Sequence, residues 1–214
     1  MTAKLVRPIN LWDAPQVKRA EKTWGHKFPD YTQYLFFNAS DEGNNFLDLG
    51  CGFGRFLEYL TNAVEEFEYI GFDSSLDMVE RVVERFPEHK VNVFHQNITE
   101  PLDYLGLHRT IVVCSAVLIH LTVDDQYKIL DNLLDAKPFA IGFDINCLPD
   151  KQLNDKYSVE RVMPPGFRMT WQSFVKFDEM ISTKFGSDYS IQSEKFKLTG
   201  RRSKHVFFLR RSGL

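Results

Sequence analysis

The middle of the chain alternates short apolar runs with segments of helical periodicity. The apolar runs cover residues 45–50, 68–73, 90–95, 111–115 and 139–144. Between them, apolar side chains recur every three or four residues, as Phe56, Leu57 and Leu60 do, which predicts amphipathic helices. This alternation is typical of βαβ units, so the sequence predicts an α/β fold with a mostly parallel sheet and helices on both faces.

The two ends of the chain depart from this rhythm. Residues 1–44 predict one helix over about 14–24 and then an aromatic stretch, which either covers a site or packs onto the sheet. Residues 148–170 are polar and proline-containing, which predicts a long loop that could cover a substrate. A helix over about 171–184 then precedes two strands, at about 189–198 and 205–211, whose close spacing predicts an antiparallel hairpin.

These patterns together predict a single domain over residues 1–214. Within it we expect an N-terminal cap over 1–44, a core over 45–147, and a final part over 148–214 with the loop, the last helix and the hairpin. The central sheet is expected to have seven strands, of which the last is antiparallel.

Composition narrows the class of protein. Apolar residues make up 43% and charged residues 26% of the 214 residues, which excludes disordered and collagen-like chains. No apolar run is long enough to cross a membrane, and the first ten residues lack the apolar segment of a signal peptide, so we expect a cytoplasmic protein without a membrane partner. The three cysteines, Cys51, Cys114 and Cys147, form no CxxC pair, so we expect buried reduced thiols and no metal site.

Charge is unevenly distributed although the net charge is only −3. Residues 46–147 carry 7 basic and 17 acidic side chains, whereas residues 148–214 carry 13 basic and 7 acidic ones. The basic residues that follow the last acid of the chain are Lys195, Lys197, Arg201, Arg202, Lys204, Arg210 and Arg211. Such a tail either contacts phosphate groups or forms a solvated hairpin that balances an acidic body.

The strongest chemical signal is a glycine-rich loop between the first strand and the first helix of the core. It contains Gly50, Gly52 and Gly54, which allow a tight turn and a close approach to a ligand. Asp73 lies 23 residues after Gly50, at the end of the next strand, where a carboxylate accepts ribose hydroxyls. The pattern predicts an adenosine-type ligand at the carboxyl ends of the strands. The third glycine comes one residue too early for the dinucleotide fingerprint GxGxxG, and the chain has no GxxxxGK[ST] P-loop.

Four segments in order resemble the motifs of class I S-adenosylmethionine-dependent methyltransferases: FLDLGCGFGRF, YIGFDSSLDMV, FHQNITE and IVVCSAVLIHL. The resemblance covers residues 45–147. It implies a Rossmann-like class I methyltransferase fold, S-adenosyl-L-methionine as cofactor and methyl transfer as activity. It also implies a cofactor-binding role for Asp48, Gly50, Cys51, Gly52, Gly54, Asp73, Ser74, Met78, Asn97, Ile98, Cys114 and Ser115.

The resemblance further implies which part of the cofactor each of these residues contacts. The glycines pass under its methionine part, Asp48 approaches the amino group and Asp73 binds the ribose. The residues expected to flank the adenine are Ser74, Met78 and Ile98, and those expected to contact the methionine backbone are Cys114 and Ser115. Asn97 stands where the family usually has Asp; its amide oxygen still accepts from the adenine amine, and a turn-forming role is the alternative.

His120 follows the fourth strand, at the edge of the sheet where this family binds the acceptor. A histidine with an ordinary pKa of about 6.5 takes up protons near neutral pH and is a candidate general base. A buried structural histidine is the alternative, since positioning alone supplies much of the rate of an in-line displacement.

We expect the acceptor to be a small molecule methylated on oxygen or nitrogen. Two alternatives remain open: an RNA or polyanion methyltransferase that uses the basic C-terminal hairpin, and a non-catalytic S-adenosylmethionine-binding protein. No (D/N)PPY-type tetrapeptide follows the fourth strand, which weighs against nucleic acid without excluding it. The sequence does not predict the oligomeric state.

Overall fold

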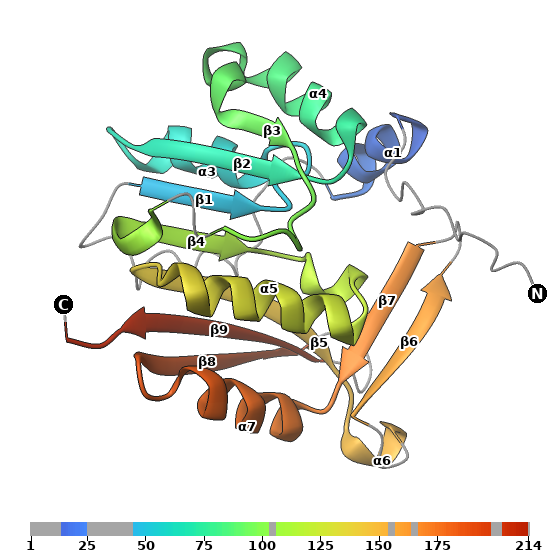
Figure 1. Cartoon of the computed structure of the whole chain (residues 1–214). Coiled ribbons are helices and arrows are strands. Elements are labelled where there is room, and N and C mark those ends of the chain that lie inside the picture. Colours follow the sequence, from blue (N-terminus) through green and yellow to red (C-terminus); the bar gives the residue numbers. More distant parts are fainter. Residues whose placement is uncertain are drawn as a thin grey trace, which may run out of the picture.

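A nine-stranded sheet runs through the molecule (Figure 1). The computed structural model describes residues 14–24, 45–102, 106–153, 157–163, 167–197 and 203–213. The strand order is β3-β2-β1-β4-β5-β7-β6; β9 pairs with β5, and β8 with β9. Helices α5 and α7 lie on one face of the sheet and α3 on the other.

The strands are β1 Asn45–Leu49, β2 Glu68–Asp73, β3 Val93–His95, β4 Thr110–Cys114, β5 Ala140–Cys147, β6 Ser158–Met163, β7 Phe167–Gln172, β8 Tyr189–Lys197 and β9 Ser203–Arg211. The α-helices are α1 Ala14–Trp24, α3 Arg55–Ala63, α4 Leu76–Arg85, α5 Val123–Ala136, α6 Asp150–Leu153 and α7 Phe174–Phe185. Short 3₁₀ helices are η1 Pro87–Asn92, η3 Leu107–Arg109 and η4 Leu118–His120.

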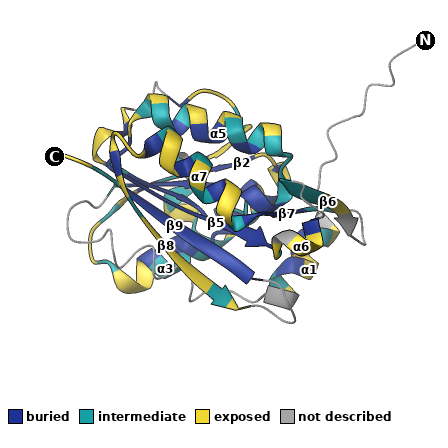
Figure 2. Cartoon of the chain, turned by 90° about the horizontal axis from the view of Figure 1, so that it is seen from below, coloured by how far each residue is buried: buried dark blue, intermediate teal, exposed yellow. Residues whose placement is uncertain are grey.

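Strands β1 to β5 form the parallel core that the apolar runs predict. β1 pairs in parallel with β2 and β4, β2 with β3, and β4 with β5. Every residue of β5 is buried, and Figure 2 shows the inner strands buried beneath helices with exposed outer faces. Because these strands are parallel, their carboxyl ends meet at one edge of the sheet, and this edge carries the candidate site.

Side-chain caps set the beginnings of three helices. Ser75 accepts the N–H of Met78 at the start of α4, and Thr122 accepts that of Asp125 at the start of α5. Ser173 caps α7, so this helix begins at residue 174 and Trp171 belongs to the preceding strand.

The expected fold class is confirmed, but the strand count and the long loop are not. Residues 158–163 and 167–172 form the antiparallel pair β6–β7, and β7 also pairs in parallel with the end of β5. Contacts far along the chain hold the hairpin: the Thr170 hydroxyl donates to the Leu121 carbonyl at 2.7 Å, and the Gln172 amide donates to the Gln126 side chain at 2.6 Å. Local sequence carries no sign of such contacts, so a polar stretch that forms strands was predicted to be a loop.

Two expectations from the sequence concern the N-terminal segment and membrane-spanning helices. The expected aromatic stretch over 25–44 lies outside the described residues, so the division into cap, core and final part stays a prediction. No helix in the described part of the chain has the length and apolar character needed to cross a membrane.

Candidate functional site

The glycine-rich loop follows β1 and is tied to the end of β2. The Phe72 carbonyl accepts the N–H groups of Gly50 and Cys51 at 2.7 and 2.9 Å, and Asp73 Oδ2 accepts the N–H of Gly52 at 2.9 Å. The structure thus brings together the loop and the carboxylate that the sequence paired. All three loop glycines have positive φ angles, of +75° at Gly50, +55° at Gly52 and +84° at Gly54.

Two of these glycines differ in what surrounds them. A Cβ at Gly50 would lie 2.4 Å from Cγ2 of Val117, so this glycine allows close packing against the loop after β4. A Cβ at Gly52 would meet no atom within 4 Å. The front of the loop at Gly52 is therefore open to a ligand.

Asp73 is buried at the end of β2, with 7% of its surface exposed. Its Oδ1 accepts the N–H of Ser75 at 2.8 Å, while Oδ2 accepts that of Gly52. Burial raises the pKa of Asp73, and the two backbone hydrogen bonds oppose that rise. Each carboxylate oxygen keeps a second lone pair, so the group retains acceptor capacity for hydroxyls.

Asp48 lies beneath the loop and is also buried. Burial raises its pKa to about 7; the hydrogen bond from the Tyr69 hydroxyl, at 3.0 Å, opposes the rise and the charge of Asp73 adds to it. Sequence analysis missed Tyr69. The alternation of β2 would have revealed it, since Tyr69 and Asp73 share one face of that strand.

The residues expected around the adenine follow β2 and β3. Ser74 is exposed, whereas Met78 and Ile98 are buried. The amide oxygen of Asn97 accepts both the N–H and the hydroxyl of Thr99, at 3.1 and 2.9 Å. This is the turn-forming arrangement that the sequence left open, and the contact of Asn97 with adenine stays a prediction.

The loop after β4 faces the glycine loop through Val117. Cys114 is buried at the end of β4, and the buried Ser115 hydroxyl has no hydrogen-bond partner among the described residues. Ala116 adopts a left-handed conformation, with φ of +58°. An unpartnered buried hydroxyl beside a strained residue is typical of a site that receives a ligand.

Asp144 of β5 holds this loop, a role that no sequence pattern indicates. Its Oδ1 accepts the N–H of Ala116 at 2.6 Å, and its Oδ2 lies 2.5 Å from Nζ of Lys204 on β9. The Asp144 side chain has 0% of its surface exposed and that of Lys204 has 6%. A fully desolvated ion pair therefore lies directly behind the loop.

His120 ends η4, close to the β6–β7 hairpin. Its Nδ1 lies 2.9 Å from the Arg168 carbonyl oxygen, which only accepts, so Nδ1 carries the proton and Nε2 the lone pair of the neutral ring. Burial lowers the pKa of His120; the bond to Arg168 opposes this and the charge of Lys204 adds to it. The ring is therefore neutral at pH 7, as a general base must be.

Comparison with known proteins identifies the core. Residues 46–136 match the family model described as a methyltransferase domain. This segment of the chain therefore resembles a methyltransferase domain in sequence. No curated protein sequence matches the chain.

Solved methyltransferase structures share the fold of this chain at low sequence identity. Magnesium protoporphyrin IX methyltransferase from Synechocystis PCC 6803, with bound SAM, gives a TM-score of 0.57 at 15% identity over 93% of this chain and 79% of that one. An S-adenosylmethionine-dependent methyltransferase from Clostridium acetobutylicum ATCC 824 gives 0.59 at 13% identity, covering 92% and 97%. The small RNA methyltransferase HEN1 gives 0.62 at 16% identity, over 95% of this chain and 26% of that one.

The residues present fit S-adenosylmethionine, the cofactor that the resemblance implies. The open front of Gly52 leaves room for a ligand, Asp73 keeps lone pairs for ribose hydroxyls, and the Ser115 hydroxyl lacks a partner among the described residues. Among the residues that the structure describes, no cluster of His, Cys, Asp and Glu is arranged to hold a metal ion.

Proposed function

We propose that the protein methylates oxygen or nitrogen of a small molecule that binds between the loop after β4 and the β6–β7 hairpin. The position of the hairpin is the observation that carries this proposal. β4 ends with Cys114 opposite Phe143, whereas β7 pairs with β5 only at Asn146 and Cys147. Since β9 occupies the other edge of β5 along its whole length, the hairpin lies beyond the carboxyl end of β4.

The hairpin narrows the acceptor side of the sheet. It is fixed to the loop after β4 by the His120–Arg168 and Thr170–Leu121 contacts, so it forms a wall next to the reacting centre rather than a free arm (Figure 1). Because the hairpin stands beside this edge of the sheet, the space favours a small acceptor that can enter it. A long polymer would have to lie across the hairpin.

The chain's own residues have distinct roles in this proposal. Asp73 accepts the ribose hydroxyls, Asp48 lies near the amino group, and the Ser115 hydroxyl bonds the methionine part. When bound, the cofactor would supply a methyl group on a positively charged sulfur; an acceptor lone pair would form the new bond to this methyl group, and S-adenosylhomocysteine would leave. His120 then receives the acceptor's proton at Nε2, while its Nδ1–H stays on the Arg168 carbonyl.

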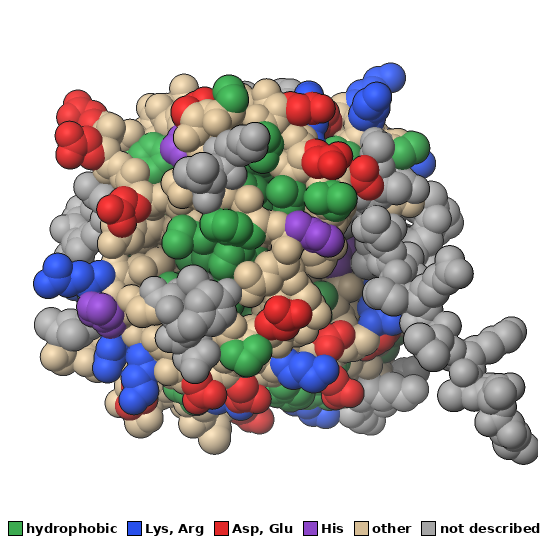
Figure 3. Space-filling model, turned by 45° about the horizontal axis from the view of Figure 1, so that its top comes forward, with side chains coloured by type: hydrophobic (Ala, Val, Ile, Leu, Met, Phe, Trp, Pro, Cys, Tyr) green, Lys and Arg blue, Asp and Glu red, His purple; other side chains and the backbone are tan. Residues whose placement is uncertain are grey.

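Two basic residues of the β8–β9 hairpin, Lys204 and Arg210, are not placed to bind one phosphate group together. Lys204 pairs with Asn146 at the carboxyl end of β5 and Arg210 pairs with Ala140 at the amino end, six residues and about 20 Å apart. Lys204 is also buried against Asp144. Figure 3 shows a different face, turned toward the viewer from the top of Figure 1, on which the Lys and Arg side chains are scattered.

A transfer assay tests the proposal. The protein is incubated with methyl-tritiated S-adenosylmethionine and either a low-molecular-weight cell extract or total cellular RNA, with Asp73→Ala as the control for cofactor-dependent labelling. Label in the small-molecule fraction supports the proposal. Label in RNA, lost steeply as salt rises, would replace it with the RNA alternative; no label despite tight binding of S-adenosylhomocysteine would replace it with the non-catalytic one.

A further inference from the structure

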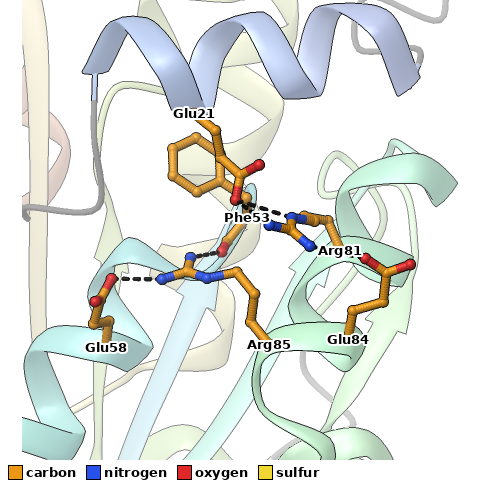
Figure 4. A network of polar contacts seen from close by, with 6 residues as sticks. All are labelled: Glu21, Phe53, Glu58, Arg81, Glu84 and Arg85. Atoms are coloured by element: carbon orange, nitrogen blue, oxygen red, sulfur yellow. Dashed lines mark hydrogen bonds and ion pairs between the residues drawn. The ribbon is translucent and has the colours of Figure 1, made fainter.

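Helix α1 lies against the outer side of the glycine loop (Figure 4). Phe53, between the second and third glycines, is 2% exposed. It forms a small cluster with Val17 and Ala20 of α1 and Met78 of α4, separate from the two larger hydrophobic cores. The Phe53 side chain is therefore buried by α1 and α4 rather than by the sheet.

An ion pair joins α1 to α4 beside this cluster. Glu21 Oε1 lies 2.9 Å from Nε and 2.8 Å from Nη2 of Arg81, and the Glu21 side chain is only 12% exposed. Arg81 Nη1 also lies 2.9 Å from the exposed carboxylate of Glu84, in its own helix. Arg81 thus contacts one partner within α4 and one across the α1–α4 interface, and the two contacts can be removed separately.

A second arginine fixes the backbone of the same loop. Nη1 of Arg85 donates to the Phe53 carbonyl, and its Nη2 lies 2.5 Å from Glu58 on α3. Phe53 is flanked by Gly52 and Gly54, both in left-handed conformations that give the loop freedom to rearrange. The Phe53 side chain is thus held by α1 and α4, and its carbonyl by Arg85 of α4.

We propose that helix α1 belongs to the cofactor site and clamps Phe53, so that the glycine loop keeps the conformation that binds S-adenosylmethionine. The Glu21–Arg81 ion pair is the positioning contact that keeps this helix docked. A helix of 11 residues is marginal by itself in water, so α1 stays ordered only while docked. Loss of the ion pair therefore releases both the helix and the loop. This inference rests on the cofactor lying over the glycine loop, as the proposed function requires.

Charge reversal tests the clamp. The variants are Glu21→Arg, Arg81→Glu and the double exchange, with Glu84→Gln as the control that removes only the contact within α4. For each we measure binding and dissociation of S-adenosylhomocysteine, and hydrogen exchange of the amides in residues 14–24. We expect each single reversal to weaken binding about tenfold, mainly through faster dissociation, and to speed exchange in α1. The double exchange should restore both to within about threefold of wild type, and Glu84→Gln should match wild type.

Three results would overturn the inference. If the single reversals speed exchange in α1 but leave the affinity and the dissociation rate unchanged, α1 is a peripheral helix. If both singles weaken binding and the double exchange does not recover it, the ion pair is not the positioning contact. If the wild-type protein fails to bind S-adenosylhomocysteine, the assignment of the cofactor site is wrong, and the inference about α1 is wrong with it. This outcome is distinct from the first two.

Discussion

Lys204→Met removes one partner of the buried ion pair behind the loop after β4. Met keeps the length of the side chain, so the main change is that the carboxylate of Asp144, with 0% exposure, loses its cation 2.5 Å away. Breaking a buried pair in this way costs about 3–5 kcal/mol, because an uncompensated charge stays in the interior. For a chain of this size, 1 kcal/mol corresponds to about 2–4 °C, so the midpoint of thermal unfolding should fall by roughly 6–20 °C.

Urea unfolding and calorimetric melting measure this loss. Lys195→Met, at an exposed position of β8, is the matched control and should change the free energy of unfolding by less than about 0.5 kcal/mol. The double variant Asp144→Asn with Lys204→Met removes both charges and keeps an oxygen for the Ala116 N–H, so it should recover much of the loss. A single variant as stable as the control, or a double variant no more stable than the single, would refute the reasoning.

Three other predictions concern the cofactor loop. Asp73→Ala should weaken binding of S-adenosylhomocysteine at least tenfold in calorimetry, or about 1.4 kcal/mol, because the ribose loses its acceptor; unchanged affinity would contradict the assignment. Gly50→Ala should reduce thermal stability more than Gly52→Ala, since only the methyl group at residue 50 meets Val117. Gly52→Ala should instead reduce the affinity for S-adenosylhomocysteine, because it places a methyl group in the open front of the loop. Equal effects of the two variants on stability would contradict this. Asp48 has a pKa of about 7 folded against 3.8 unfolded, so between these values the native state binds more protons, and the free energy of unfolding falls as pH rises through this window. Urea titrations at several pH values should show that Asp48→Asn loses this contribution, and an identical pH dependence in variant and wild type would contradict it.

The parallel core and the contact between Asp73 and the glycine-rich loop could be predicted because their signals are local. Apolar runs mark the strands, and the shared edge of parallel strands brings Asp73 to the glycines. The Asp144–Lys204 pair joins residues 60 positions apart, and the β6–β7 hairpin is held by residues of η4 and α5. Contacts of this kind leave no periodic trace in the sequence, which is why these features were missed.

Isothermal calorimetry with S-adenosylhomocysteine, and with NAD as the control ligand, tests the central claim most directly. We expect micromolar binding of S-adenosylhomocysteine at one site per chain, no binding of NAD, and at least tenfold weaker binding of S-adenosylhomocysteine in Asp73→Ala. A folded wild-type protein that binds NAD, or that does not bind S-adenosylhomocysteine, would contradict it.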